Sequence, residues 1–209
     1  MQTVTVITAD IIDSRQALDQ VAKLPKALST IHHDLLLTPF SLSRGDEIQA
    51  VCRGTLEAPE LIRHLRYACF PLKLRVAVGL GEAEGEGEGE RQAVTSWQMN
   101  GTAFLRARDA IDRLKKTRDT KTALSSGDPR LDLIANTILS LIDAIQDKWT
   151  KEQWDAVHAY EKAGTLAAAA DILGVSYQSV QKRCKAAKWS TVEQAEKSLP
   201  AICKSIGYW

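Results

Sequence analysis

Residues 40–54 of the 209-residue chain read FSLSRGDEIQAVCRG. Two short runs in which apolar and polar residues alternate flank Arg44, Gly45 and Asp46, and this pattern is typical of a tight β-hairpin. A β-rich run, TVTVIT, precedes the hairpin at residues 3–8, and another, LKLRVAVGL, follows it. The first part of the chain therefore predicts four strands, of which the hairpin supplies the second and the third.

Helical patterns separate these strands. Apolar residues recur every three or four positions over residues 14–37, where Pro25 is expected to bend or interrupt the helix. Residues 59–70 and 101–116 predict two further helices, and residues 121–125 predict a last short strand. The order β-α-β-β-α-β belongs to the split β-α-β arrangement of ferredoxin-like folds, so we expect an α+β protein.

The remainder of the chain is helical in its pattern, which predicts three parts. A ferredoxin-like, palm-type domain is expected over residues 1–126, a connecting helix over residues 127–149 and a helix-turn-helix unit over residues 150–209. One stretch of low complexity, GEAEGEGEGE at residues 81–90, predicts a mobile acidic loop or a long hairpin.

The C-terminal part contains the spacing of a helix-turn-helix. Residues 165–189 read TLAAAADILGVSYQSVQKRCKAAKW, in which Gly174 supplies a tight turn and Ser176 can cap the second helix. The small Ala170 stands four residues before this glycine, and the apolar Val180 stands six residues after it. Two closely crossing helices need a small and an apolar residue at these positions. The unit resembles region four of sigma factors and related response-regulator domains.

The second helix of this unit predicts a surface for double-stranded DNA. Hydrogen-bonding and cationic side chains suit base edges and phosphates in a major groove. Together with the cap, the expected DNA-binding residues are Ser176, Tyr177, Gln178, Gln181, Lys182 and Lys185. A helical bundle that uses the same turn only for packing is the alternative. Residues 150–209 hold eight Lys or Arg and six Asp or Glu, and this small excess favours weak binding or a homodimer.

Two acidic residues of the first domain are expected to meet. The topology brings Asp10, which ends the first strand, and Asp46, at the hairpin tip, to one end of the sheet. Converging carboxylates suit Mg²⁺ or Mn²⁺, and a pair of such ions serves phosphoryl transfer. In the alternative, Asp46 is only a turn residue, and Asp10 and Asp13 cap the helix that follows.

Four stretches carry a family resemblance: ITADIIDSR, SLSRGDEIQAV, LRVAVGLGE and MNGTAFLRARDAI. Together they resemble the SatD family, a group of bacterial proteins. The first two are also similar to class III nucleotide cyclases and GGDEF-type diguanylate cyclases. That similarity implies a nucleotide ligand, with Asp10, Asp46 and the Ile11 carbonyl as metal ligands.

The chain departs from the cyclases at positions that orient the base and stabilise the transition state. Class III cyclases have an Asn and an Arg where this chain has Leu105 and Asp109, and a Lys where it has Leu42. We therefore expect a DNA-binding transcriptional regulator whose palm-like domain dimerises or senses a metal or a nucleotide, and we assign no catalytic residue. The alternative is a divalent-metal-dependent nucleotidyl transferase or cyclase-like enzyme that uses Asp10 and Asp46.

Composition excludes several classes of protein. Hydrophobic residues make up 44% and charged residues 25%, which rules out a largely disordered chain. The 27 Lys and Arg nearly balance the 26 Asp and Glu, so any nucleic-acid site must be a local patch. The four Cys lie far apart without a CxxC pair, and we expect buried free thiols. No signal peptide or membrane span is expected, so the predicted compartment is the cytoplasm.

Overall fold

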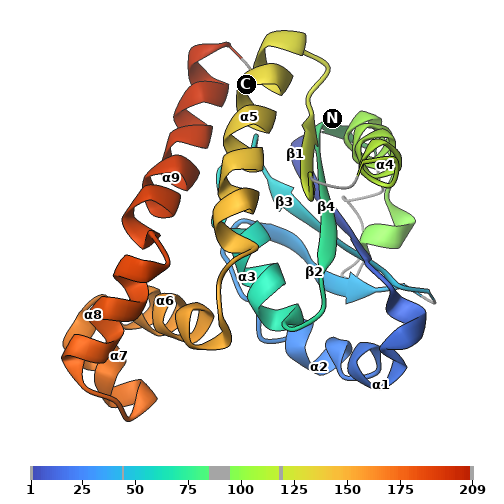
Figure 1. Ribbon diagram of the computed structural model, residues 1–209. Coiled ribbons are helices and arrows are strands. Elements are labelled where there is room, and N and C mark those ends of the chain that lie inside the picture. Colours follow the sequence, from blue (N-terminus) through green and yellow to red (C-terminus); the bar gives the residue numbers. More distant parts are fainter. Residues whose placement is uncertain (1, 44, 85–94, 118–119, 208–209) are drawn as a thin grey trace. The chain divides into compact units, whose positions relative to one another are not determined.

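The computed structural model of the protein describes residues 2–43, 45–84, 95–117 and 120–207 (Figure 1). The chain forms two compact units. Unit 1 comprises Met1–Ser140 together with Leu199–Trp209, and unit 2 comprises Leu141–Ser198. The division falls at Ser140 rather than at the expected boundaries of 126 and 150, and unit 1 also includes the end of the last helix, from Leu199 onward. Most of the acidic run at residues 81–90 lies outside the described residues.

Unit 1 is built on a five-stranded sheet, which confirms the expected α+β class. Its elements in chain order are β1 (Gln2–Ile11), η1 (Ser14–Gln16), α1 (Leu18–Val21), α2 (Leu24–Leu28), β2 (Leu36–Leu42), β3 (Glu47–Arg53), α3 (Glu60–Cys69), β4 (Leu74–Ala83), η2 (Ser96–Gln98), α4 (Thr102–Leu114), β5 (Thr122–Ser125) and the first part of α5 (Pro129–Gln146). The strand order is β2-β3-β1-β4-β5. Neighbouring strands are antiparallel except for β4 and β5, which are parallel.

The expected helix over residues 14–37 is wrong in its second half. Helix α2 ends at Leu28, and the chain then turns and enters β2 at Leu36. Polar side chains after α2 favour this turn, because the hydroxyls of Ser29 and Thr30 donate to carbonyls of the last helical turn. The ring of His33 then accepts a hydrogen bond from the Leu35 amide at 3.1 Å. Local hydrogen bonds therefore end the helix although the apolar spacing continues.

The two faces of the sheet bury different parts of unit 1. Ile7 and Ile11 of β1 belong to a large core that includes side chains of α3 and α5. Figure 1 shows these two helices on one face of the sheet and α4 on the other. Val4 and Val6 point to the opposite face, where they pack against alanines of α4. The backbone of α4 lies very close to β4, since a Cβ on Gly79 would be 2.0 Å from the carbonyl oxygen of Ala103. Small residues on both elements therefore allow α4 to cover this face.

Unit 2 is helical. It contains the end of α5, helices α6 (Lys151–Ala163), α7 (Leu166–Leu173) and α8 (Tyr177–Ala186), and the first part of α9 (Trp189–Ser205). Helices α6, α7 and α8 contact one another in all three pairs. The Trp149 indole donates to the carbonyl of Ala187 at 2.9 Å and meets the Trp154 ring edge to face.

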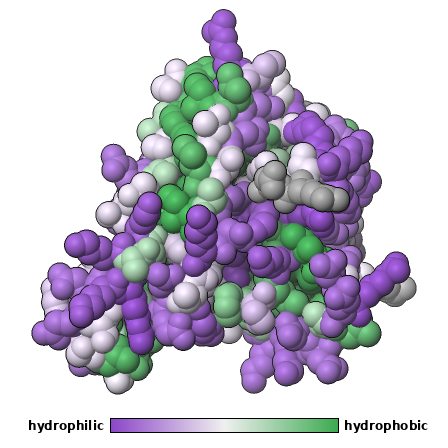
Figure 2. All heavy atoms as spheres, viewed as in Figure 1, coloured by the Kyte–Doolittle hydropathy of each residue, from purple (hydrophilic) through white to green (hydrophobic). Residues whose placement is uncertain are grey.

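Two further expectations concern the four cysteines and the absence of a membrane-spanning helix. Cys52, Cys69, Cys184 and Cys203 are free and buried, as the sequence predicts. Within the described part of the chain, every helix is too short or too polar to span a bilayer. The face seen in Figure 2 is mostly hydrophilic, and hydrophobic side chains gather over α5, where Leu133 is 71% exposed.

Candidate functional site

The turn between α7 and α8 has the geometry that the sequence predicts. Gly174 ends α7 with φ 62° and ψ 35°, a left-handed conformation that glycine adopts readily. Ser176 then begins α8, because its hydroxyl accepts a hydrogen bond from the Ser179 amide. Val180 and Cys184 of α8 are buried, and Ala170 of α7 is 5% exposed. The small Ala170, the turn at Gly174 and the apolar Val180 therefore allow α8 to pack against α7.

The opposite face of α8 is uncovered within unit 2. Each of the expected DNA-binding residues is exposed: Ser176, Tyr177, Gln178, Gln181, Lys182 and Lys185. Two further cations were missed by the sequence reasoning, the half-exposed Arg183 and the exposed Lys188. No acidic residue occurs in the sequence between Asp171 and Glu193. The stretch between Asp171 and Glu193 therefore carries a local excess of positive charge, which lies on and just after α8.

The structure brings the two expected acidic residues of unit 1 to one end of the sheet. Asp10 is paired with Glu47 in the β1–β3 ladder, and Asp46 directly precedes Glu47. The amide of Ile11 donates to the carbonyl of Asp46 at 3.3 Å. The ends of β1 and β3 therefore place three carboxylates from neighbouring strands near one another.

The carboxylates of Asp10 and Asp46 already have partners within the protein. One oxygen of Asp10 lies 3.0 Å from Arg75, and the other lies 3.5 Å from Lys115. Asp46 accepts a hydrogen bond from the hydroxyl of Ser14. Asp13 precedes η1 but makes no capping hydrogen bond, so the alternative in which Asp13 caps the following helix is not supported. A metal ion at Asp10 would have to replace two cationic side chains as its countercharge.

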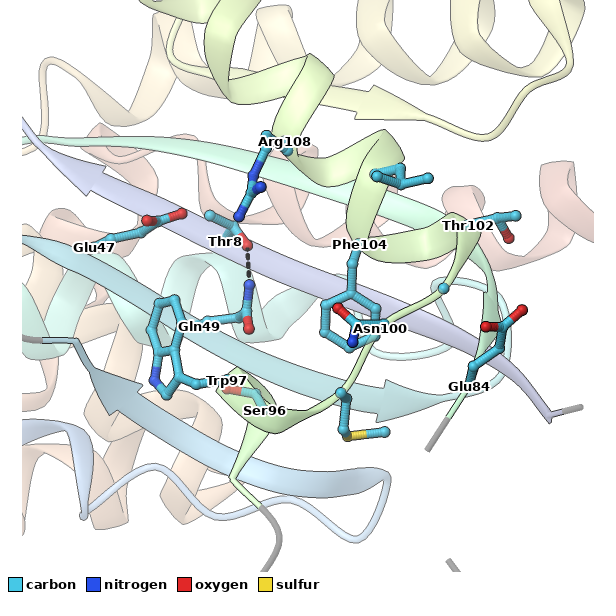
Figure 3. Close-up of a pocket in the computed structure, with 13 residues that line it drawn as sticks. Thr8, Glu47, Gln49, Glu84, Ser96, Trp97, Asn100, Thr102, Phe104 and Arg108 are labelled. Carbon is cyan, nitrogen blue, oxygen red and sulfur yellow. Dashed lines mark hydrogen bonds between the residues drawn. The ribbon is translucent and has the colours of Figure 1, made fainter. Parts of the chain in front are cut away.

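A cavity of about 370 Å³ opens on the α4 face of the same sheet (Figure 3). Its floor is formed by side chains of β1 and β3, and its walls by η2, the turn before α4 and the first half of α4. The lining includes Glu47, Gln49, Ser96, Trp97, Phe104 and Arg108. The sequence reasoning missed this cavity. The available signal was the alternation of Glu47 and Gln49 with apolar residues of β3, which predicts two polar groups on one face.

Hydrogen bonds fix the orientation of the cavity side chains. The amide nitrogen of Gln49 donates to the Thr8 hydroxyl at 3.0 Å, as Figure 3 shows. The indole nitrogen of Trp97 donates to the Ser41 hydroxyl at 2.9 Å. The turn that holds Trp97 is closed by a capping box between Thr95 and Gln98. The cavity is therefore built from ordered side chains.

Glu47 has an unusual electrostatic environment at the end of the cavity. Burial raises the pKa of its carboxyl above the ordinary value of 4.5. The cations Lys115 and Arg108 oppose this shift, and the carboxylates of Asp10 and Asp46 reinforce it. The charged form of Glu47 is therefore less stable in the folded protein than it is in water.

Metal ligation receives no direct support from clusters of ligating side chains. Within the residues that the structure describes, no group of three or more His, Cys, Asp or Glu is arranged to hold a metal ion. The two-carboxylate arrangement of Asp10 and Asp46, with the Ile11 carbonyl, is smaller than such a group and stays a prediction.

Comparison with known proteins identifies the family. Residues 4–193 match the model of the SatD family. No curated protein matches the chain. The matched range includes the strands of unit 1, the residues around Asp10 and Asp46, and the whole of α8. Because the match spans nearly the entire chain, the protein belongs to the SatD family.

Proposed function

We propose that this SatD-family protein is a cytoplasmic DNA-binding protein that regulates transcription, and that α7 and α8 form its helix-turn-helix. The exposed, positively charged face of α8 is the observation that carries the proposal. Four cationic residues, Lys182, Arg183, Lys185 and Lys188, lie within seven residues of sequence. A local group of cations without neighbouring acidic residues can bind a polyanion even where the whole protein is nearly neutral.

The side chains on α8 divide into two chemical groups. Lys182 and Lys185 suit phosphate oxygens, which position a protein on the duplex. Gln178 and Gln181 suit base edges, because a carboxamide can donate to and accept from adenine in the major groove. Tyr177, which is 44% exposed, lies at the start of α8, where recognition helices contact bases.

Unit 1 is proposed to be a ferredoxin-like palm that dimerises or senses a ligand. The order β2-β3-β1-β4 with antiparallel neighbours supports the palm assignment. The exposed Leu133 and Ile134 on the unit 1 part of α5 support a homodimer. A homodimer would present two copies of α8 and set the spacing of two half-sites.

Fluorescence anisotropy of the full chain with labelled genomic DNA fragments tests the proposal. Measurements at several salt concentrations separate phosphate contacts from other binding, because each contact releases counterions. We expect an affinity that falls linearly with salt on logarithmic axes. Absence of binding at low salt, with the protein folded by circular dichroism, contradicts the proposal.

A second candidate function is a divalent-metal-dependent nucleotidyl transferase or cyclase-like enzyme. The meeting of Asp10 and Asp46 at one end of the sheet favours it. The pairing of Asp10 with Arg75 and Lys115 disfavours it, because both carboxylate oxygens face cations. Thermal unfolding with Mg²⁺ or Mn²⁺ and nucleoside triphosphates tests it. A stabilisation that Asp46→Asn abolishes supports the enzyme, and an unchanged melting temperature contradicts it.

A further inference from the structure

We propose that the cavity beside α4 binds a flat 2-amino-4-oxopyrimidine ring that carries an acidic group. Guanine nucleotides and carboxylated pterins share this chemistry. The proposal rests on the sensing role proposed for unit 1, and it names the class of ligand that unit 1 would sense. Four features of the cavity support it: two aromatic rings, two hydrogen-bond acceptors on one strand, a buried hydroxyl without a partner, and a cation at the rim.

The aromatic rings offer flat apolar surfaces. Trp97 and Phe104 come from η2 and α4, and in Figure 3 they lie on either side of the Gln49 amide. The indole of Trp97 is 37% exposed although its nitrogen is held by Ser41. An ordered and partly exposed ring can stack on a heterocycle without first losing much conformational freedom. The shape of the walls therefore favours a planar ligand.

The floor of the cavity presents hydrogen-bond acceptors. Gln49 uses its amide nitrogen on Thr8, which leaves its carbonyl oxygen as the group available to a ligand. Glu47 lies two residues away on the same strand face and offers the two oxygens of its carboxylate. A 2-amino-4-oxopyrimidine presents a ring N–H and an adjacent amino group, which a carboxylate accepts together. The acceptor pattern therefore selects this ring over adenine, which has a single amino donor on that edge.

Ser96 provides an independent indication of a ligand. It lines the cavity and is 1% exposed, and its hydroxyl has no hydrogen-bond partner in the described structure. Buried hydroxyls in native proteins are nearly always paired, because an unpaired one is destabilising. A polar ligand in this cavity, or a water molecule that it orders, would supply the missing partner.

Arg108 supplies a positive charge on the α4 side of the cavity. It acts on Glu47 through space, and the described residues contain no ion pair between the two. Its guanidinium points toward the cavity floor in Figure 3. A phosphate or a carboxylate on the ligand can pair with this guanidinium while the ring contacts Glu47. The cavity therefore suits a ligand with a donor edge and a separate anionic group.

Isothermal titration calorimetry of the full chain, without DNA, tests the proposal. The titrants are GMP, guanosine, AMP and pterin-6-carboxylate. We expect GMP, pterin-6-carboxylate or both to bind, and the stronger of the two identifies the natural source of the ring. AMP should bind at least about tenfold more weakly, because it cannot satisfy the Glu47 carboxylate with two adjacent donors.

Matched variants locate the binding. Glu47→Gln should weaken GMP or pterin binding about 10- to 100-fold, because an amide cannot accept two donors as a carboxylate does. Glu57→Gln, an exposed glutamate that does not line the cavity, should leave the affinity unchanged. Arg108→Gln should abolish the preference for GMP over guanosine, whereas Arg113→Gln on the same helix should retain it.

Three results would overturn the inference. They are equal affinities for GMP and AMP, no effect of Glu47→Gln on a ligand that binds, and no heat from any titrant while thermal unfolding shows a folded protein. The calorimetry and the DNA anisotropy measurements test separate proposals, and each proposal can be refuted without the other. A chain that binds GMP but not DNA refutes only the proposed DNA binding, and a chain that binds DNA but none of the titrants refutes only the proposed ligand.

Discussion

Asp10 and Arg75 are direct partners in the antiparallel β1–β4 ladder, and their side chains form an ion pair at 3.0 Å. The Asp10 side chain is 15% exposed, so solvent screens the pair only in part. The two residues are 65 positions apart in sequence. The ion pair therefore links the end of β1 to the start of β4 at the acidic end of the sheet.

Arg75→Met should lower the free energy of unfolding by about 1–3 kcal/mol, because the largely buried Asp10 carboxylate loses its closest cation and keeps Lys115. Urea unfolding measures the change. A double-mutant cycle with Asp10→Asn isolates the pair, and a coupling energy of zero would refute its contribution. Lys197→Met is the matched control. It removes an exposed ion pair with Glu193 and should leave stability unchanged.

Glu47→Gln should stabilise the protein at neutral pH. Burial raises the pKa of Glu47 above 4.5 in the folded state, with Asp10 and Asp46 acting in the same direction and Lys115 and Arg108 opposing. Between the pKa of Glu47 in the unfolded state and its higher pKa in the folded state, the folded protein keeps a proton that the unfolded chain has released. The free energy of unfolding therefore falls as the pH rises through this interval. The advantage of the variant should be absent at a pH below 4.5 and should grow as the pH rises above that value, until Glu47 is ionised in the folded state as well. Thermal unfolding across this range checks the sign, and an advantage that is largest at acid pH would contradict it.

The hairpin was predictable from sequence, whereas the end of α2 was not. A turn flanked by alternating residues is a local pattern, and β2 and β3 form on either side of Gly45 as that pattern predicts. Leu35 and Leu36 fit both a helical and a strand pattern. Side-chain hydrogen bonds around Ser29 and His33 decide between the two.

The three candidate sites differ in how far they could be predicted from the sequence. The α8 face was predictable, because one helix and one turn supply all its residues. The convergence of Asp10 with Asp46 followed from strand order. The cavity was not predictable, because Trp97 and Glu47 belong to elements that meet only through the tertiary fold, and Arg75 pairs with Asp10 only through the β4 register.

Gly79→Ala should destabilise unit 1, because the added Cβ would lie 2.0 Å from the Ala103 carbonyl and 2.5 Å from the Ala107 amide of α4. Backbone atoms cannot move aside as a flexible side chain can, so we expect a loss of about 1–3 kcal/mol in urea unfolding. Gly45→Ala is the matched control, since its Cβ would meet only the Ser43 hydroxyl at 3.9 Å. Equal stabilities of the two variants would show that α4 does not pack closely on β4.

Gln178→Ala should relax the sequence preference of DNA binding with little change in the salt dependence. An exposed carboxamide near the start of α8 contacts base edges rather than phosphates in the proposed arrangement. Selection of bound sequences from a random DNA pool, carried out with wild type and variant, checks this prediction. The variant should lose preference at a single position of each half-site. An unchanged selected sequence would remove Gln178 from the recognition surface.

Lys182→Ala should weaken binding to all DNA sequences alike and reduce the logarithmic salt slope by about one, because one phosphate contact and its released counterion are lost. Lys162→Ala, at an exposed lysine in the last turn of α6, removes the same charge from a different helix of unit 2 and should leave the slope unchanged. Anisotropy titrations at several salt concentrations compare the two variants. Equal losses in both would mean that only the net charge of the unit matters. A loss confined to Lys182 would place the phosphate backbone against α8.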